Sequence, residues 1–266
     1  MRSLALVAFA LTCTQVQAAG IESRDCLVLP SKSVDLGGTI PGQLSGVFAD
    51  IGDRVTEGQI VASLRTEVQE AVLAVAQLRA TNRAPVEAAI ARLEYEAQEL
   101  ERSETLRDRG VTTLASAQER QTAHKIRLRE LEEAEMDLEL SKLDLERAQA
   151  ELEIRKIRSP IDGIVADRML DAGEYLRDDG NVVTIVDLDP LRVEVFLPQT
   201  HYAKIAGGDP VMVVPDLSDG SARMAVVEAI DAVIDPASAT FRVRLDLPNP
   251  DGDVIAGVRC TASFGE

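Results

Sequence analysis

The sequence predicts an α+β protein of several modules, in which one long helical segment is inserted into a β-rich module. Three stretches of contrasting composition indicate this. Residues 27–64 are rich in β-forming residues and glycine, residues 65–158 in Ala, Glu, Leu and Arg, and residues 159–266 return to Val, Ile, Gly, Pro and Asp in short alternating runs. Strands, then helices, then strands again is the order expected when a helical segment interrupts a β-module.

Composition and charge narrow the possible functions. The chain has 266 residues, enough for one to three modest domains, and its lack of Trp with only three Tyr and five Phe favours thin aliphatic modules over one large core. The formal net charge of −17 would repel nucleic acid and anionic lipid, which argues against DNA, RNA and membrane-surface binding. A solvated helical surface is the simplest reason for the acidity, and a specific cationic partner is the alternative.

The first residues are typical of a secretory signal peptide, which we expect at residues 1–19. Arg2 is followed by the apolar stretch Leu4–Thr12 and by the small-residue exit Val16-Gln17-Ala18. This apolar stretch is too short to span a bilayer as a helix, although an uncleaved anchor is the alternative. Cys13 could indicate lipid attachment, but a threonine stands before it where a small residue is expected. We therefore expect an exported mature chain without a membrane span.

The second half of the helical segment, from about Leu114 to Ile157, predicts a long helix with a narrow coiled-coil seam. Leucines recur every seven residues, and small residues follow three positions after the first three of them. These are Leu131, Leu138, Leu145 and Leu152, with Ala134, Ser141 and Ala148. At 1.5 Å per residue the helix would be a rod of roughly 65 Å.

The first half, from about Thr66 to Asp108, predicts the partner helix of a hairpin. Its seam is formed by Val86, Leu93 and Leu100, with Ile90 and Ala97 four residues after the first two. Pro85 should kink or divide this arm, because proline lacks a backbone donor and clashes with the preceding turn. Gly110 should end it, and residues 109–113 should turn the chain. The sequence thus predicts an antiparallel hairpin over residues 65–158, with a solitary structural coiled coil as the alternative.

The β-segments on the two sides of this hairpin resemble each other. Ser45–Phe48 and Gly52–Ala62 precede it, and Ser159–Val165 and Gly173–Leu176 follow it. Each pair reads as a strand entered through glycine, a tight Gly-acidic turn and a second strand. Such an internal repeat indicates one structural motif present in two copies.

These segments resemble the half-motifs of biotinyl and lipoyl domains. The order half-motif, hairpin, half-motif, barrel is similar to the periplasmic adaptors, or membrane fusion proteins, which include HlyD-like and RND-type efflux subunits. The resemblance implies a split lipoyl/biotinyl-like β-sandwich of residues 35–64 and 159–188 with the antiparallel α-helical coiled-coil hairpin inserted. A small β-barrel of residues 189–266 would follow, joined by an N-terminal strand at residues 20–34.

Segments of the last third resemble the barrel domain of that family, and one feature of the halves departs from it. The barrel-like segments are Leu188–Val195, Asp235–Val243, Asn249-Pro250 and Ala256–Cys260. The first half-motif is short, since Gly46 and Gly52 are closer in sequence than Gly163 and Gly173. The chain also ends soon after the barrel, without an obvious membrane-proximal domain, which leaves its mode of transporter docking open.

The resemblance implies a protein without cofactor or enzymatic activity. In carrier domains the two halves meet at a turn that holds a modified lysine, and neither Ser63–Thr66 nor Ile157–Pro160 contains one. A biotin- or lipoyl-type carrier subunit is the alternative. His124 and His201 are isolated, and no zinc spacing, nucleophile elbow, P-loop or dinucleotide fingerprint is present. We therefore name no catalytic, cofactor-binding or metal-binding residue.

The resemblance also implies partners. The protein would link an inner-membrane transporter of RND or ABC type to an outer-membrane channel, as a periplasmic ring of copies that is expected to be hexameric. In the family the hairpin tip carries an Arg, a Leu, a Ser and an apolar–Asp pair. Arg102, Leu106 and Thr113 match or approach this pattern, whereas Ala117-Gln118 departs from it. We expect Arg102, Leu106, Thr113 and Gln118 to contact the channel, although they could be ordinary helix residues.

Two cysteines, Cys26 and Cys260, remain after the expected signal peptide. Both lie in strand-like sequence near opposite ends of the chain. An even pair in an oxidising compartment predicts a disulfide, which would require the first and last strands to lie side by side. Two buried free thiols are the alternative.

Overall fold

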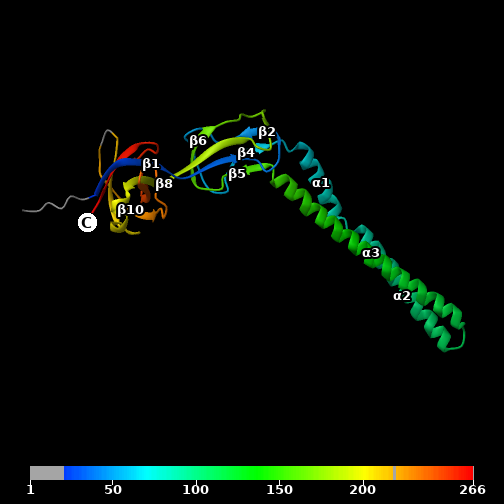
Figure 1. The fold of residues 1–266 in the computed structure, drawn as a ribbon. Helices are drawn as coiled ribbons and strands as arrows, with labels where there is room; N and C mark the ends of the chain where they lie inside the picture. The colour runs from blue at the N-terminus through cyan, green and yellow to red at the C-terminus, as the bar shows by residue number, and fades with distance from the viewer. Residues whose placement is uncertain (1–20, 218–219, 266) are drawn as a thin grey trace, which may run out of the picture. The chain divides into compact units, whose positions relative to one another are not determined.

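The computed structural model describes residues 21–217 and 220–265, so the expected signal peptide lies outside the described residues. The described chain forms two compact units (Figure 1). One unit comprises Asp35–Thr184, and the other combines the residues up to Val34 with those from Ile185 onward. Each unit is described by itself.

The first unit contains a β-sandwich whose strands come from both sides of the helical hairpin (Figure 1). One sheet has the order β5-β4-β2-β7, and a second pairing joins β3 to β6. The strands are β2 (Gly42–Val47), β3 (Arg54–Val55), β4 (Ile60–Leu64), β5 (Lys156–Arg158), β6 (Gly163–Arg168) and β7 (Tyr175–Leu176). Ala62 faces Ile157 across β4 and β5, and Gln43 faces Tyr175 across β2 and β7. Each half therefore completes the sheet of the other.

The two half-motifs exchange backbone hydrogen bonds reciprocally. Gly52 and Gly173 occupy equivalent turns with φ of +90° and +91°, a conformation that a residue with a Cβ resists. The four bonds run from Gly52 N to Val165 O (2.9 Å), from Val165 N to Asp53 O (3.0 Å), from Gly173 N to Leu44 O (2.9 Å) and from Leu44 N to Glu174 O (2.9 Å). The turn of each half thus binds the strand of the other. The two halves repeat in sequence because both must form the same turn and strand.

Aliphatic side chains from both halves fill the sandwich. The fully or almost fully buried members include Leu44, Val61, Leu64, Val165, Leu176 and Val182. Burying such side chains contributes about 1.5–3 kcal/mol each relative to leaving them in water. Since neither half can cover its apolar face alone, the core favours the assembled sandwich.

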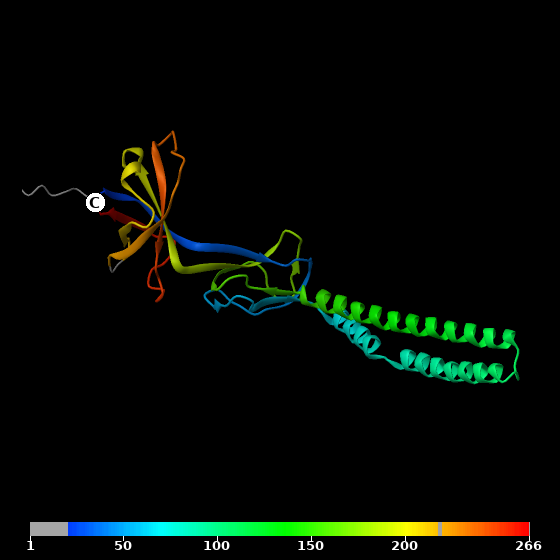
Figure 2. The same ribbon diagram turned by 90° about the horizontal axis from the view of Figure 1, so that it is seen from below.

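The helical segment forms the predicted antiparallel hairpin, with its first arm divided. The helices are α1 (Glu67–Thr81), α2 (Ala84–Asp108) and α3 (Leu114–Glu153). Pro85 lies in the first turn of α2, where its missing N–H costs no hydrogen bond. Both α1 and α2 pack on α3 (Figure 2). The 40 residues of α3 make a rod of about 60 Å at 1.5 Å per residue.

The predicted end of the second arm was wrong by several residues. We expected helix as far as Ile157, but α3 ends at Glu153 and Lys156–Arg158 form β5. The Ile157 side chain is buried, and Leu64 N donates to Arg155 O at 2.9 Å. Pairing with β4 and burial of one isoleucine outweigh the helical preference of the local sequence.

The leucine seam of α3 is confirmed, whereas the seam of α2 differs in one position. All seven predicted seam residues of α3 are buried or half-buried. On α2, Val86 is buried and Leu93 and Leu100 are half-buried, but Ile90 is 37% exposed. The positions between them are filled by Ala89 and Glu96, because this seam steps three residues before it steps four.

Glu96 places a carboxylate inside the seam. Its side chain is only 9% exposed, and its Oε1 lies 3.3 Å from Nη1 of Arg120 on α3. His124 and Arg127 occupy half-buried positions on the same helix. A buried carboxylate loses its hydration and needs a cation to offset that loss, so Glu96 and Arg120 depend on each other.

The second unit is a closed six-stranded barrel of order β1-β12-β9-β10-β11-β8, in which β8 also pairs with β1. Its strands are β1 (Ile21–Gly37), β8 (Asn181–Pro198), β9 (Pro210–Pro215), β10 (Arg223–Ile230), β11 (Thr240–Leu247) and β12 (Arg259–Phe264). Side chains of β11 alternate between buried and half-buried positions, as expected when every second residue points inward. Ser23 Oγ on β1 donates to Phe196 O on β8 at 3.1 Å.

A disulfide joins the first strand of the barrel to the last. Cys26 on β1 faces Cys260 on β12, with Cα atoms 4.9 Å apart, and the two form a disulfide. Both cysteines are almost fully buried. The bond spans 234 residues of sequence, so it removes many conformations from the unfolded chain.

Replacing both cysteines by serine should lower the free energy of unfolding of the barrel by about 2–4 kcal/mol. Urea titration followed by circular dichroism in the β-sheet region would measure this change. Wild-type protein unfolded in reducing agent is the matched control and should show the same loss. An unchanged midpoint in both samples would contradict the structural role of the bond.

Replacing Arg120 by alanine should destabilise the hairpin by about 1–3 kcal/mol, because it leaves the Glu96 carboxylate buried without its partner. Replacing Glu96 by leucine should instead leave the stability of the hairpin unchanged or raise it, since a leucine fits an apolar seam. Thermal unfolding at 222 nm would measure both changes. The opposite order of stabilities would show that Glu96 is solvated in solution.

Candidate partner-binding surfaces

The hairpin tip is shaped by a helix stop and a helix start. Gly110 has φ of +72°, its N–H donates to Arg107 O at 2.8 Å, and Val111 N donates to Leu106 O at 2.9 Å. This pair of bonds is the Schellman arrangement that ends helices. Thr113 begins α3 by accepting a bond from Ser116 N on its hydroxyl at 3.2 Å.

The structure brings the four predicted tip residues to the same end of the hairpin. Arg102 and Leu106 lie in the last turns of α2, Thr113 caps α3, and Gln118 is exposed near its start. The Arg102 guanidinium is exposed and forms a 2.7 Å ion pair with Glu99. The Thr113 hydroxyl serves the helix cap, so a capping role is enough to explain a hydroxyl residue there. Whether these residues contact a partner remains a prediction.

Two apolar residues of the tip escaped the sequence reasoning. Val111 in the turn is 70% exposed, and Leu114 at the start of α3 is 63% exposed. Leu106, near the end of α2 and before the turn, is partly exposed. A turn that only reverses the chain needs no apolar side chain in water. The signal was an apolar residue immediately after the turn glycine and another at the first helical position. Contiguous exposed apolar patches are typical of contact surfaces, which makes these three residues candidates for one.

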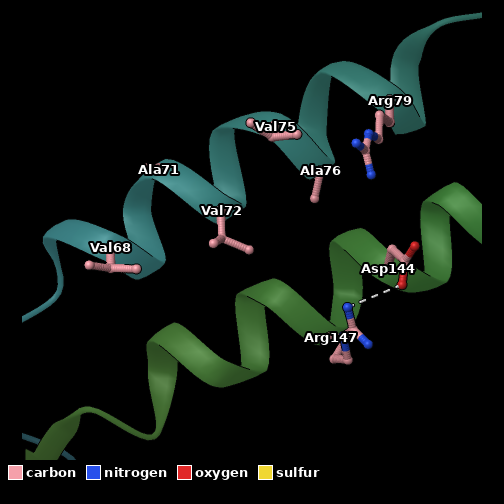
Figure 3. Close-up of a pocket in the computed structure, with 8 residues that line it drawn as sticks. All are labelled: Val68, Ala71, Val72, Val75, Ala76, Arg79, Asp144 and Arg147. Atoms are coloured by element: carbon pink, nitrogen blue, oxygen red, sulfur yellow. Dashed lines mark ion pairs between the residues drawn. The ribbon is translucent and has the colours of Figure 1, made fainter.

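A second surface lies at the base of the hairpin, where α1 packs beside α3 (Figure 3). It is an apolar groove of about 360 Å³. Val68, Val72 and Val75 line it from α1, and the close-up shows Arg79 at its far end. Asp144 and Arg147 line it from α3 as an ion pair of 3.4 Å. Sequence reasoning did not identify this groove.

An ion-pair cluster holds the chain where the hairpin rejoins the sandwich. Glu153 accepts from Lys156 Nζ at 2.7 Å and from Arg158 Nη2 at 2.7 Å. These hydrogen bonds lower the pKa of the Glu153 carboxyl. Lys156 lies on β5, one residue before the Ile157–Pro160 segment, and it pairs with Ser63 on β4. Its ammonium is engaged by Glu153.

Other chemistry is sparse in the part of the chain that the structure describes. Within residues 21–217 and 220–265, His, Cys, Asp and Glu side chains form no group of three or more that could hold a metal ion. His124 lies half-buried in the seam, and His201 lies in the short 3-10 helix Gln199–Lys204. None of the helices in these residues is both long and apolar enough to cross a membrane.

Two family models match the chain, and together they cover nearly all of its described length. The CzcB-like barrel-sandwich hybrid domain matches residues 32–187, and the CusB-like β-barrel domain matches residues 191–266. A search of curated protein sequences found no match.

Solved structures share the fold at low sequence identity. MacA from Actinobacillus actinomycetemcomitans has a TM-score of 0.78 and 16% identity, covering 93% of this chain and 79% of that one. The membrane fusion protein Spr0693 from Streptococcus pneumoniae R6 has a TM-score of 0.64 and 15% identity, covering 94% and 99%. ZneB from Cupriavidus metallidurans has a TM-score of 0.51 and 20% identity, covering 92% and 98%.

These findings confirm the predicted fold class, a split lipoyl-like sandwich with an inserted helical hairpin followed by a small barrel. The first family model alone spans more than half of the chain. The chain therefore belongs to the family of membrane fusion proteins, the periplasmic adaptors of efflux systems.

Proposed function

We propose that this protein is the periplasmic adaptor of a tripartite efflux or secretion system, linking an inner-membrane transporter of RND or ABC type to an outer-membrane channel. The observation that carries the proposal is the helical hairpin, a rod of about 60 Å. The chain enters and leaves the hairpin at its base, in one sandwich, and the tip at the opposite end exposes apolar side chains. Such a hairpin holds its tip at a distance from the sandwich, where the tip can bind a partner. This role requires no catalytic residue. Transport energy would come from the transporter.

The compartment follows from the same proposal. Residues 1–19 would direct export as a signal peptide, and the mature protein would stay at the inner membrane through its transporter. The Cys26–Cys260 disulfide supports an oxidising compartment such as the periplasm. The mature protein would carry no bound cofactor.

At the tip, apolar anchors and a charged rim would contact the channel. Leu106, Val111 and Leu114 supply the apolar surface, and the exposed Arg102 guanidinium supplies the charge beside it. Interfaces commonly take most of their affinity from a few apolar or arginine side chains near their centre. Thr113 and Gln118 would complete the contact.

Several copies of the chain would stand side by side as a ring, which we propose to be a hexamer. Such a ring would surround a channel between the two membranes, and the hairpins would together form the wall of this channel. The barrel and sandwich units would also lie next to their equivalents in neighbouring copies. Closed rings of this kind arise when one face of a subunit binds a different face of the next.

The double variant Val111→Asp, Leu114→Asp should reduce co-purification of the outer-membrane channel roughly tenfold or more, because it places charge in the apolar centre of the contact. Leu114 begins α3, where a carboxylate favours the helix, so the fold should be kept. The readout is affinity capture of the crosslinked full chain from its native membranes, with channel and transporter identified by mass spectrometry.

Tyr95→Asp is the matched control, since Tyr95 is an exposed α2 residue away from the tip. It should retrieve both partners as wild type does, and the tip variant should still retrieve the transporter. Channel recovery that is equal in all three samples would overturn tip docking. Failure of wild type to retrieve any membrane transporter would overturn the adaptor function, and added cofactor mass on the intact chain would favour a carrier.

A further inference from the structure

The groove at the base of the hairpin is lined by a row of three valines that ends in an arginine (Figure 3). Val68, Val72, Val75 and Arg79 recur on α1 in steps of four, three and four residues, so they follow one line along the helix. All four side chains are exposed. Because a β-branched side chain keeps one main rotamer in a helix, the valines form a fixed apolar wall. We call this hollow the valine groove.

Small side chains where α1 meets α3 leave room for the valine groove. Ala71 and Ala76 lie on α1 beside the valines, and Ala76 is buried at the contact with α3. On the α3 side, Ala148 is buried as well. Alanine fills little of the space between two packed helices, so a hollow of about 360 Å³ remains. This volume lies in the range of sites that bind small molecules.

The two ends of the valine groove differ in charge. Arg147 in its α3 wall is paired with Asp144 at 3.4 Å. Arg79, in the last turn of α1, forms no ion pair with any residue in the described part of the chain. Glu70 lies in the first turn of the same helix, and no cation pairs with it within the described residues. An anion is therefore favoured at the Arg79 end and disfavoured at the other.

The length of the valine groove fits a single hydrocarbon chain. Val68 and Arg79 are eleven residues apart on α1, which corresponds to about 16 Å at 1.5 Å per residue. An extended alkyl chain with bonds of about 1.5 Å advances roughly 1.25 Å per carbon, so about 12 to 14 carbons would cover this length. The row is only one residue wide, which suits one such chain.

A helix of another protein would suit these features less well. It would bury Arg79 and the Asp144–Arg147 pair beneath apolar side chains, and removing such charges from water is costly. An alkyl chain can lie along the valines and leave the ion pair at the edge of the groove. A carboxylate at the end of that chain would form charge-assisted hydrogen bonds with the Arg79 guanidinium.

We propose that the valine groove binds one anionic amphiphile with a single alkyl chain, of the fatty acid class. Its carboxylate contacts Arg79, and its chain runs along Val75 and Val72 toward Val68. Apolar burial drives the binding, and the arginine sets the orientation of the ligand. The inference goes beyond the adaptor function, which requires no ligand, and does not depend on it.

A series of saturated fatty acids with 8 to 16 carbons tests the length of the site. Each is titrated into the full mature chain by isothermal titration calorimetry, below the concentration at which it forms micelles. The affinity should rise about two- to fourfold for each added methylene, because each buries further apolar surface. It should level off at about 12 to 14 carbons, where the chain reaches the end of the groove, with one molecule bound per protein chain.

Three variants test the position of the site and its charge. Val72→Glu should weaken dodecanoate binding roughly tenfold or more, because it places a carboxylate in the apolar wall. Arg79→Gln should weaken dodecanoate binding about three- to tenfold and leave the affinity for dodecyl maltoside, which has the same chain and an uncharged head group, unchanged. Leu140→Glu is the matched control, since Leu140 is exposed on α3 and does not line the groove.

The fold of each variant is checked by its helical circular dichroism, which should equal that of wild type because the replaced side chains are exposed. Bound dodecanoate should also raise the thermal midpoint of wild type at 222 nm, since a ligand stabilises the state that binds it. The midpoint of Val72→Glu should not respond to dodecanoate, and that of Leu140→Glu should respond as wild type does.

Several results would overturn the inference. These are the absence of saturable dodecanoate binding to wild type, wild-type affinity in Val72→Glu, and an affinity that still rises from 14 to 16 carbons. An equal loss of dodecanoate and maltoside binding in Arg79→Gln would refute the role of the arginine. Binding to vesicles of anionic phospholipid without binding of free dodecanoate would indicate a membrane contact instead. Retrieval of a transporter tests the adaptor function separately and is unaffected by any of these results.

Discussion

The structure depends on the reciprocal hydrogen bonds between the two half-motifs of the sandwich. The turn at Gly52 binds the strand at Val165, and the turn at Gly173 binds the strand at Leu44. Neither half is a stable sheet by itself, because two-stranded pieces cannot bury an apolar face. Everything inserted between the halves is therefore held by its ends. Closing so long a loop costs only slightly more entropy than closing a short one, so the insertion is tolerated.

The hairpin uses this anchorage. A two-helix rod buries little surface, and its outer half contains a charged pair, Glu96 with Arg120, within the seam. Fixed ends reduce the number of alternative registers, and the buried carboxylate further disfavours a shifted one. The rod can then expose apolar residues at its tip and sides that are free for partners. The contacts that stabilise the hairpin lie at its base, and the surfaces available for binding lie at its tip and sides.

Much of this architecture could be predicted from the sequence, because its signals are periodic and local. Seven-residue leucine spacing placed the seam of α3, and Pro85 marked the division between α1 and α2. The sequence could not reveal states that depend on distant partners. Residues 156–158 have helix-compatible composition, and only their pairing with β4 makes them a strand. Glu96 looks like a surface residue until Arg120 is opposite it, and the valine groove exists only once α1 lies beside α3.

The central claim is that the assembled halves hold the hairpin, and native-state hydrogen exchange of the full chain tests it most directly. The account predicts that backbone amides of β2, β4 and β6 exchange only through global opening of the sandwich, whereas those of α2 and the first turns of α3 exchange through smaller, local openings. Sandwich amides that exchange faster than those of the outer hairpin would contradict the account, because the rod would then be stable without its anchor.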